Sequence, residues 1–170
     1  DEATDCIDCA VGTFSAAASD AAEDCIDCPL GRYSATTPIA ESECIDCVAG
    51  RHSPADANEG NADPAAACVA CDAGKYLNRT GSDEASDCMN CTCGTYSNVT
   101  AATTIDTCLD CVAGKYAVGE GNDDEADCTL CAMGKYYEIG GQCVDVCLDC
   151  VAGKYLETEG NDEEEDCDLC

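Results

Sequence analysis

Cys108-Leu109-Asp110-Cys111-Val112-Ala113-Gly114-Lys115-Tyr116 is the stretch that decides the fold. Its skeleton, Cys-x-x-Cys-x-x-Gly-x-aromatic, occurs in eight successive copies, with His52 in the aromatic position of the third. A ninth Cys-x-x-Cys follows at Cys167 and Cys170. A fixed spacing sustained over a whole chain is typical of tandem-repeat proteins.

The chain therefore divides into repeats of about 20 residues rather than into globular domains. Repeats of this size bury surface only against their neighbours, so we predict one continuous array over 1–170. The third repeat is the longest because it carries an insertion, and the acidic start of the chain matches the tails of later repeats. We expect a segment of a longer array. The repeat boundaries are 6–24, 25–43, 44–67, 68–87, 88–107, 108–127, 128–146 and 147–166, with the start of a ninth at 167–170.

Composition favours covalent staples over a conventional core. The 170 residues include 20 Cys but one Phe, seven Tyr and no Trp, too little large apolar surface to hold the chain together. Such cysteine density indicates an oxidising compartment, so we predict an extracellular, secreted or cell-surface location. A net charge of −29 argues against nucleic-acid binding, which needs a basic surface. No run of eighteen apolar residues exists, so we expect no membrane insertion within this segment.

The order of residues inside a repeat predicts a short hairpin. The glycine permits a tight turn after the second cysteine, the chain then runs extended, and a polar loop returns to the next cysteine. The aromatic residue can lie against a disulfide, where sulfur–ring contact stabilises by about 0.3–1.5 kcal/mol. The predicted fold class is a small disulfide-rich fold, mostly irregular with short β-hairpins. We expect it to form an elongated tandem-repeat rod with no single hydrophobic core.

The paired cysteines suit zinc binding, redox exchange or structural disulfides. Cys-x-x-Cys pairs about 15–20 residues apart occur in zinc ribbons, but nine pairs do not divide into four-ligand sites, and the chain has a single histidine. A thioredoxin-like centre needs a βαβ setting that the repeat lacks. We therefore favour disulfides.

The connectivity follows from what a disulfide can constrain. A bond inside Cys-x-x-Cys would constrain almost nothing, whereas one that closes a loop of about fifteen residues stabilises by roughly 3 kcal/mol. We predict that the second cysteine of each pair bonds to the first of the next, one of several patterns that the sequence allows. The predicted bonds are Cys9–Cys25, Cys28–Cys44, Cys47–Cys68, Cys71–Cys88, Cys91–Cys108, Cys111–Cys128, Cys131–Cys147 and Cys150–Cys167.

Four cysteines fall outside this pattern. Cys6 and Cys170 lie at the two ends, where they suit bonds to preceding and following segments. Cys93 and Cys143 lie two repeats apart, beyond the roughly 7 Å Cα separation that a disulfide tolerates if the rod is stiff. We therefore predict that these four form intermolecular disulfides or link distant segments of an assembly.

The pattern has a counterpart among known proteins. Cys25-Ile26-Asp27-Cys28-Pro29-Leu30-Gly31-Arg32-Tyr33-Ser34 resembles the ephrin-receptor-like cysteine-rich repeat. It is also similar to the simplest single-disulfide module of the tumour necrosis factor receptor family; tandem copies occur in surface and secreted proteins of single-celled eukaryotes. The resemblance covers the whole chain and implies irregular, hairpin-based modules stacked end to end. It implies no single function, because such modules serve as spacers, receptors and coats alike.

Two sequons predict N-linked glycans. Asn78-Arg79-Thr80 and Asn98-Val99-Thr100 both lie in polar loops after the aromatic position, where a secreted chain is accessible to modification. Asn90-Cys91-Thr92 also fits the sequon, but a bonded Cys91 would shield it.

Calcium is the one metal for which the loops offer candidate ligands, and no cofactor is required for the fold. Two loops gather carboxylates around a glycine, although neither has the one-three-five spacing of an EF-hand. A solvated acidic turn explains the same residues, so both interpretations stay open. The candidate ligands are Glu120, Asp123, Asp124, Glu159, Asp162 and Glu163.

Six of the seven basic residues occupy one position, between the glycine and the aromatic residue. We expect them to pair with an acidic loop of the next repeat or of another chain, each exposed pair contributing about 0–1 kcal/mol. They are Arg32, Arg51, Lys75, Lys115, Lys135 and Lys154.

We do not expect an enzyme. His52 stands in the aromatic position and suits packing, whereas general-base chemistry needs a convergent partner and a pocket. The sequence favours a structural extracellular glycoprotein, a disulfide-stapled repeat segment of a filament, coat or fibre. Its partners would be glycans and itself, through head-to-tail or lateral self-assembly. The alternative is a ligand-binding or adhesion ectodomain of a cell-surface receptor.

Overall fold

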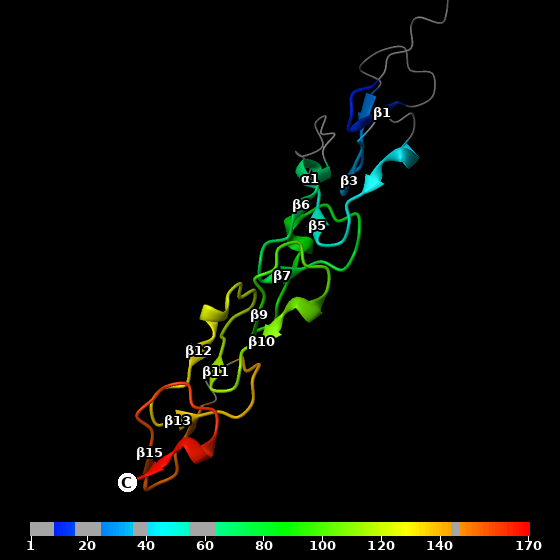
Figure 1. Ribbon diagram of the computed structural model, residues 1–170. Coiled ribbons are helices and arrows are strands. Elements are labelled where there is room, and N and C mark those ends of the chain that lie inside the picture. Colours follow the sequence, from blue (N-terminus) through cyan, green and yellow to red (C-terminus); the bar gives the residue numbers. More distant parts are fainter. Residues whose placement is uncertain (1–8, 16–24, 36–40, 55–63, 144–146) are drawn as a thin grey trace, which may run out of the picture. The chain divides into compact units, whose positions relative to one another are not determined.

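Two-stranded antiparallel hairpins form the sheet structure of the described residues (Figure 1). The computed structural model describes residues 9–15, 25–35, 41–54, 64–143 and 147–170. The hairpins are β1 (Thr13–Ser15) with β2 (Cys25–Asp27), β3 (Arg32–Tyr33) with β4 (Ile45–Asp46), β5 (Arg51–His52) with β6 (Val69–Ala70), β7 (Lys75–Tyr76) with β8 (Met89–Asn90), β9 (Thr95–Tyr96) with β10 (Leu109–Asp110), β11 (Lys115–Tyr116) with β12 (Thr129–Leu130), β13 (Lys135–Tyr136) with β14 (Leu148–Asp149), and β15 (Lys154–Tyr155) with β16 (Asp168–Leu169).

Each hairpin joins two neighbouring repeats. Its first strand follows the turn glycine of one repeat, and its second strand lies inside the Cys-x-x-Cys of the next, as where Tyr116 pairs with Thr129. The aromatic position is therefore opposite the residue after a cysteine in every hairpin. The predicted small, disulfide-rich and mostly irregular fold with short hairpins is confirmed.

A glycine turn leads into each first strand. In the opening motif the N–H of Lys115 donates to the carbonyl of Val112 at 3.1 Å, with Gly114 at φ +77° between them. A positive φ at the third position of such a turn suits glycine, because it has no Cβ. The glycines at this position in all eight repeats have φ between 77° and 90°.

Helical structure among the described residues is short. It consists of one α-helical turn in the insertion and 3-10 turns that lead into the cysteines. These are α1 (Pro64–Ala67), η2 (Glu41–Glu43), η3 (Ala85–Asp87), η4 (Ile105–Thr107), η5 (Glu125–Asp127) and η6 (Glu164–Asp166). Within the described ranges, no helix has the length and apolar character needed to cross a bilayer.

The chain forms two compact units. The N-terminal unit comprises Asp1–Cys71 and Leu77–Cys88, and the C-terminal unit comprises Asp72–Tyr76 and Met89–Cys170. Among the described residues, neither unit has a single core. Small clusters of buried residues recur instead, and cysteines supply most of their members, as in the cluster of Cys111, Ala117 and Cys128. Sulfur thus fills the place that large apolar side chains take in larger domains.

Loops connect repeats that are not neighbours. We call the surface that binds such a loop a loop seat, and it consists of three groups. The first is the turn glycine of one repeat. The other two come from the repeat that follows it: the carbonyl of its second cysteine and the backbone N–H of the residue after its aromatic residue. In the C-terminal unit, Gly121 lies against Gly74. The N–H of Gly121 donates to the carbonyl of Cys91 at 2.8 Å, and the N–H of Ser97 donates to the carbonyl of Asn122 at 3.1 Å. The loop therefore reaches back two repeats to the glycine.

The same seat recurs in both units. In the N-terminal unit, Gly81 lies against Gly31 and donates to the carbonyl of Cys47, and the N–H of Ser53 donates to the carbonyl of Ser82. Two further seats follow in the C-terminal unit. Their central residues are Gly94 with Gly141 and Gly114 with Gly160. Backbone hydrogen bonds, rather than side chains, thus carry much of the contact between repeats.

Candidate functional site

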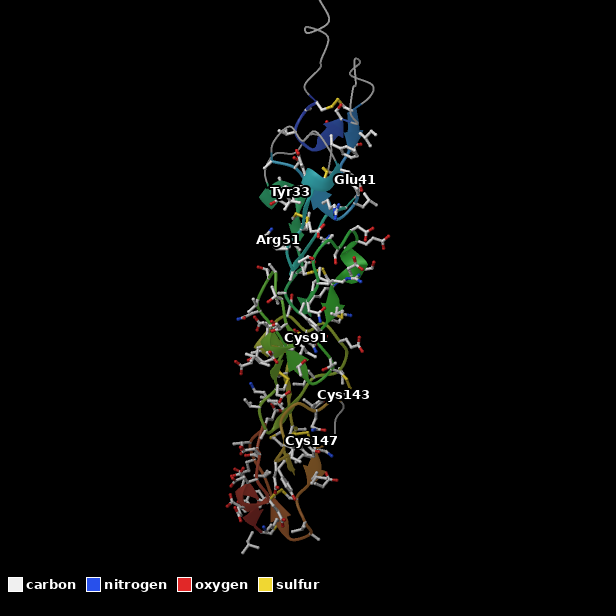
Figure 2. All side chains as sticks on the ribbon, turned by 90° about the vertical axis from the view of Figure 1, so that its right-hand side faces the viewer. Tyr33, Glu41, Arg51, Cys91, Cys143 and Cys147 are labelled. Atoms are coloured by element: carbon white, nitrogen blue, oxygen red, sulfur yellow. A yellow bond between two sulfur atoms is a disulfide. The ribbon has the colours of Figure 1, made fainter. Side chains whose placement is uncertain are left out.

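Disulfides follow one another along each unit, as the sulfur atoms in Figure 2 show. Eight of them join the second cysteine of one pair to the first of the next, with Cα separations of 5.6 to 6.0 Å. Each closes a sequence separation of 16 to 21 residues, which corresponds to roughly 3 kcal/mol per bond in the chain-entropy treatment. The bonds are Cys9–Cys25, Cys28–Cys44, Cys47–Cys68, Cys71–Cys88, Cys91–Cys108, Cys111–Cys128, Cys131–Cys147 and Cys150–Cys167.

The prediction of intermolecular bonds at Cys93 and Cys143 is wrong. These two cysteines bond to each other across 50 residues, with a Cα separation of 4.6 Å. The reason is the loop seat: Gly141 lies against Gly94, which is next to Cys93, so the chain two repeats on passes beside it. A spacing of two repeats therefore brings the two cysteines together instead of keeping them apart.

The other two cysteines with predicted intermolecular bonds are Cys6 and Cys170. Cys6 lies outside the described residues. Cys170 has an exposed free thiol, and nothing in the structure tests its predicted link to another chain.

Aromatic residues pack against disulfides, as expected, but one repeat further along than their own. Phe14 lies in a cluster with Cys28 and Cys44, and Tyr96 packs against the cluster that holds Cys111 and Cys128. These rings therefore cover the disulfide of the following repeat. This contact ties the register of one hairpin to the covalent frame of the next.

His52 follows the same rule. Its Nδ1 lies 3.7 Å from Sγ of Cys88, and the side chain is 6% exposed. Among the described residues, His52, Cys71 and Cys88 form the one group whose ligand-type atoms lie within 4.8 Å of one another. Both sulfurs are consumed in the Cys71–Cys88 disulfide, so they are not thiolate ligands for a metal. The imidazole here acts as a packing substitute for the tyrosine of other repeats.

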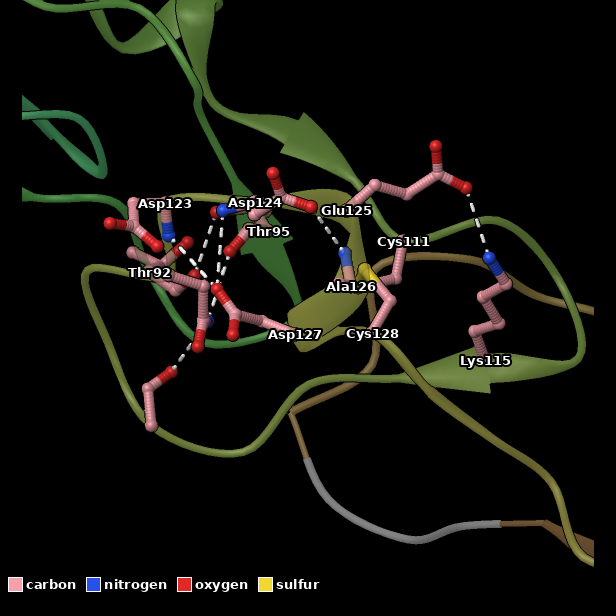
Figure 3. Close-up of a disulfide and its surroundings, with 12 residues drawn as sticks. Thr92, Thr95, Cys111, Lys115, Asp123, Asp124, Glu125, Ala126, Asp127 and Cys128 are labelled. Atoms are coloured by element: carbon pink, nitrogen blue, oxygen red, sulfur yellow. Dashed lines mark hydrogen bonds and ion pairs between the residues drawn. A yellow bond between two sulfur atoms is a disulfide. The ribbon is translucent and has the colours of Figure 1, made fainter.

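The basic position pairs either with an aspartate of the next repeat, which lies in the paired strand rather than in the expected loop, or with the acidic loop of its own repeat. Arg32 contacts Asp46 at 2.6 Å across the strands, and Lys135 contacts Asp149 at 3.1 Å in the same way. Lys115 instead contacts Glu125 of its own loop at 3.0 Å (Figure 3). All three pairs are solvent-exposed in part, so each contributes about 0–1 kcal/mol.

Acidic residues before the cysteines cap the 3-10 turns, a role that the sequence interpretation missed. Oδ2 of Asp127 accepts from the N–H groups of Asp123 and Asp124, and Oδ1 of Asp124 accepts from the N–H of Ala126 (Figure 3). These bonds satisfy donors at the start of η5. The signal was present in the sequence as an aspartate directly before the cysteine in several repeats.

Asp87 has the same role in η3. Burial alone would raise its pKa, but hydrogen bonding from the N–H of Glu84, the charge of Arg79 and the N–H of Asp83 outweigh it and lower the pKa of Asp87 below 3.8. Arg79 also donates directly to Oδ1 of this carboxylate. Asp87 is therefore held as an anion that closes the loop against its own backbone.

Capping also bears on the first set of calcium candidates. Asp124 and the N–H of Asp123 are engaged in the η5 cap, and Oε1 of Glu125 accepts from Lys115. The structure thus uses this loop as a hydrogen-bonded turn. Glu120 lies exposed in the same loop.

The second set lies beside an open acidic hollow of about 370 Å³ in the C-terminal unit. Asp162 and Glu163 line it, while Glu159 is exposed outside it. The pKa of Glu163 is raised above 4.5, first by Glu165 and then by Asp162 and Asp166. Like-charge repulsion is therefore concentrated here. The other lining residues are Glu138, Glu164 and Glu165.

Both predicted glycosylation sites are accessible. Asn78 and Asn98 are exposed in loops that follow buried or half-buried aromatic strands, as are the threonines of both sequons. Cys91 is bonded to Cys108 and fully buried, so the third sequon lies against the staple.

No protein-family model matches the chain, and a search of curated proteins finds no matching relative.

Proposed function

We propose that this chain is a structural segment of an extracellular glycoprotein, whose repeats belong to a filament, coat or fibre. One observation carries the proposal: sixteen cysteines of the described residues form disulfides between neighbouring pairs, and the loops between these disulfides bond to the backbone of repeats one and two positions back. In such a chain each repeat is stabilised locally, so the chain does not need a large hydrophobic core. Its role is then mechanical rather than catalytic.

The proposed location is extracellular, because disulfides persist in oxidising compartments. The exposed Asn78 and Asn98 would carry N-linked glycans there. Glycans and carboxylates together would give a hydrated surface that keeps a chain of net charge −29 soluble.

The resemblance to ephrin-receptor-like cysteine-rich repeats is compatible with this proposal and with the receptor alternative alike. The structure supplies what that resemblance implies locally, namely short hairpins each closed by one disulfide. Calcium is proposed only as a counterion for the acidic loops, because the described carboxylates act as caps or repel one another.

A receptor or adhesion ectodomain is the second candidate, and one observation favours it. Large apolar side chains recur directly after the first cysteine and stay about half exposed: Ile45 by 50%, Leu109 by 53% and Leu148 by 52%. Exposed apolar residues at a fixed repeat position suit contact with a ligand.

Electron microscopy of native material, with antibodies against this chain, distinguishes the two candidates. A structural role predicts label along filaments or a surface coat. Label confined to isolated particles in the membrane would overturn it in favour of the receptor. Treatment with an N-glycosidase should increase the mobility of the secreted chain in two steps, and N78Q and N98Q should each remove one. A secreted chain unaffected by the enzyme would refute glycosylation at both sites.

A further inference from the structure

One disulfide of the C-terminal unit differs from the other disulfides in its exposure. Cys143 is exposed and its partner Cys93 is half-buried. Every other disulfide of the described residues has at least one buried cysteine, and in five of them both cysteines are buried. Those five are Cys28–Cys44, Cys47–Cys68, Cys71–Cys88, Cys111–Cys128 and Cys131–Cys147. The Cys93–Cys143 bond is therefore the disulfide that a molecule in solution reaches most easily.

Packing explains this difference. The buried clusters of the described residues contain cysteines of the disulfides between neighbouring pairs, and apolar side chains cover them, as Phe14 covers Cys28 and Cys44. Neither Cys93 nor Cys143 belongs to any of these clusters. A disulfide without such cover is open to thiols in the folded state, whereas a covered one reacts only after the fold opens locally.

The two cysteines occupy defined positions in a loop seat. Cys93 directly precedes the turn glycine Gly94, and Cys143 is the second residue after the loop glycine Gly141. The three other seats have an aliphatic residue at the first of these positions and an aspartate at the second, so no covalent bond links them there. The pairs are Leu30 with Asp83, Ala73 with Asp123, and Ala113 with Asp162.

The seats without a disulfide have the same backbone contacts as the seat that has one. The N–H of Gly141 donates to the carbonyl of Cys111 at 2.8 Å, and the N–H of Ala117 donates to the carbonyl of Gln142 at 3.0 Å. In the seat that receives Gly160, the corresponding distances are 2.8 Å and 3.1 Å. Backbone groups and the packing of glycine on glycine therefore place the loop, and the Cys93–Cys143 bond is not needed for that placement.

We propose that the Cys93–Cys143 disulfide is an exchange site for small thiols, with Cys143 as the sulfur that is attacked. Exchange requires that a thiolate reach one sulfur of the disulfide, and exposed disulfides are for that reason the labile ones. Of the two cysteines, Cys143 is the more exposed. The ligand class is a low-molecular-weight thiol such as glutathione or free cysteine. This modification goes beyond the proposed structural role and does not depend on it.

The exchange balances without an added oxidant. The small thiol loses its proton to water, and its sulfur forms a bond to Sγ of Cys143. The Cys93–Cys143 bond breaks, and its electron pair leaves with Sγ of Cys93, which takes up a proton. Because the loop stays on its seat, the Cys93 thiol remains beside the mixed disulfide and displaces the small thiol again. The concentration of the small thiol thus sets the fraction of chains that carry it.

The first experiment follows glutathione onto the folded chain of 170 residues. Free thiols are blocked with iodoacetamide, the reagent is removed, and reduced glutathione is added. Samples taken over time are quenched with acid, labelled with N-ethylmaleimide and mapped by peptide mass spectrometry. Glutathione should appear on Cys143 and maleimide on Cys93 at least about tenfold faster than at any other disulfide, because the covered disulfides must first open.

The Cys91–Cys108 disulfide is the matched internal control. It lies in the same unit, begins two residues before Cys93, and has one buried and one half-buried cysteine. It should stay intact while Cys143 is modified, and this result supports the proposal. Glutathione that appears first on Cys93 or on any other cysteine, or equal rates at Cys91–Cys108 and Cys93–Cys143, overturns it.

The second experiment tests whether the bond is needed to place the loop. The double variant Cys93→Ala with Cys143→Asp gives this seat the residue pair that Ala73 and Asp123 supply in another. Nuclear Overhauser contacts between Gly94 and Gly141 should remain, and early glutathione uptake should disappear. These contacts report geometry, so they are separate from the loss of global stability expected when a cross-link is removed. Loss of the contacts would show that the disulfide places the loop, which overturns the proposal.

The outcome is also separate from that of the proposed function. Filaments built from a chain that takes up no glutathione at Cys143 would keep the structural role and remove the exchange site. Isolated membrane particles whose chain is modified at Cys143 would do the reverse.

Discussion

At the residue scale, the glycine after the second cysteine of each repeat has two roles. The turn glycine permits positive φ, and it also leaves room for a loop from two repeats on. The sequence interpretation predicted the first use from the Cys-x-x-Cys-x-x-Gly spacing. It did not predict the second, because close approach of two backbones leaves no mark except that both residues are glycine.

Gly94→Ala separates these two uses from each other. Its φ of +82° and the nearby carbonyl of Gly141 both oppose a Cβ. Gly119→Ala is the matched control, since Gly119 has φ +89° but no atom within 4 Å of a built Cβ. Chemical unfolding with the disulfides intact should show a loss of roughly 1–2 kcal/mol for Gly119→Ala and a clearly larger loss for Gly94→Ala. Equal losses would mean that the loop seat does not contribute.

Asp87 predicts a pH dependence for the N-terminal unit. Because the folded-state pKa lies below 3.8, the carboxylate stabilises the unit above that pH, and this contribution is lost as the pH falls through the folded-state pKa. Asp87→Asn should destabilise the unit at pH 7 by about 1 kcal/mol, as for a lost cap, and should flatten the acid limb of stability against pH. Asp83→Asn removes a neighbouring charge but keeps the backbone donors, so it should leave that limb in place. An acid limb unchanged by Asp87→Asn would contradict the assignment.

Glu163 predicts the opposite sign in the C-terminal unit. Its pKa is raised above 4.5 by Glu165, Asp162 and Asp166, so the contribution of Glu163 to stability is fully present below pH 4.5 and is lost as the pH rises through the folded-state pKa. Glu163→Gln should therefore raise the thermal midpoint at pH 7, and the gain should shrink in high salt. Glu157→Gln removes one charge outside the hollow and should give a smaller gain. A lower midpoint for Glu163→Gln would show that this carboxylate has a stabilising partner.

At the scale of the hairpin, sequence spacing carried most of the information. The strand after each glycine, the pairing of second with first cysteines and the aromatic contact with sulfur all follow from short-range pattern. Spacing could not predict which repeat each loop contacts, because the loops vary in sequence and bind through backbone groups. That gap led to the wrong prediction for Cys93 and Cys143 and for the partner of Lys115.

The Cys93–Cys143 bond offers a direct test of the path of that loop. Disulfide mapping should recover one peptide pair containing both residues, and a non-reducing gel should show monomer. The double variant Cys93→Ser with Cys143→Ser should keep the other staples and lose about 3 kcal/mol, because those staples already shorten the closed loop. Cys170→Ser should leave the free energy of unfolding unchanged. Dimers that disappear in the double variant would restore the intermolecular interpretation.

For the whole molecule, repulsion among the acidic side chains opposes the stabilisation that the disulfides provide. The chain has 36 acidic and 7 basic residues, and each described basic pair is at least partly exposed. Composition alone predicted both the acidity and the need for disulfides. It could not predict the division into two units, because that division depends on contacts between residues far apart in the sequence.

Salt should therefore stabilise this protein. Raising NaCl from about 20 mM to about 500 mM shortens the screening length severalfold and weakens repulsion among the carboxylates more than it weakens five exposed ion pairs. The thermal midpoint should rise by several degrees. Potassium chloride should match sodium chloride, and an extra rise with calcium at equal ionic strength would indicate specific binding. A midpoint that falls with salt would show that the ion pairs dominate.

The contact between a glycine and a loop two repeats on has a consequence for how far apart two residues can constrain each other. The sixth and eighth repeats share Val-Ala-Gly-Lys-Tyr and the Glu-Gly-Asn loop. Gly160 of the eighth is seated on Gly114 of the sixth, and the matching Gly121 of the sixth is seated on Gly74 of the fourth. Equivalent loops thus meet equivalent glycines, so a change at one turn glycine limits which residues the loop two repeats further on can carry.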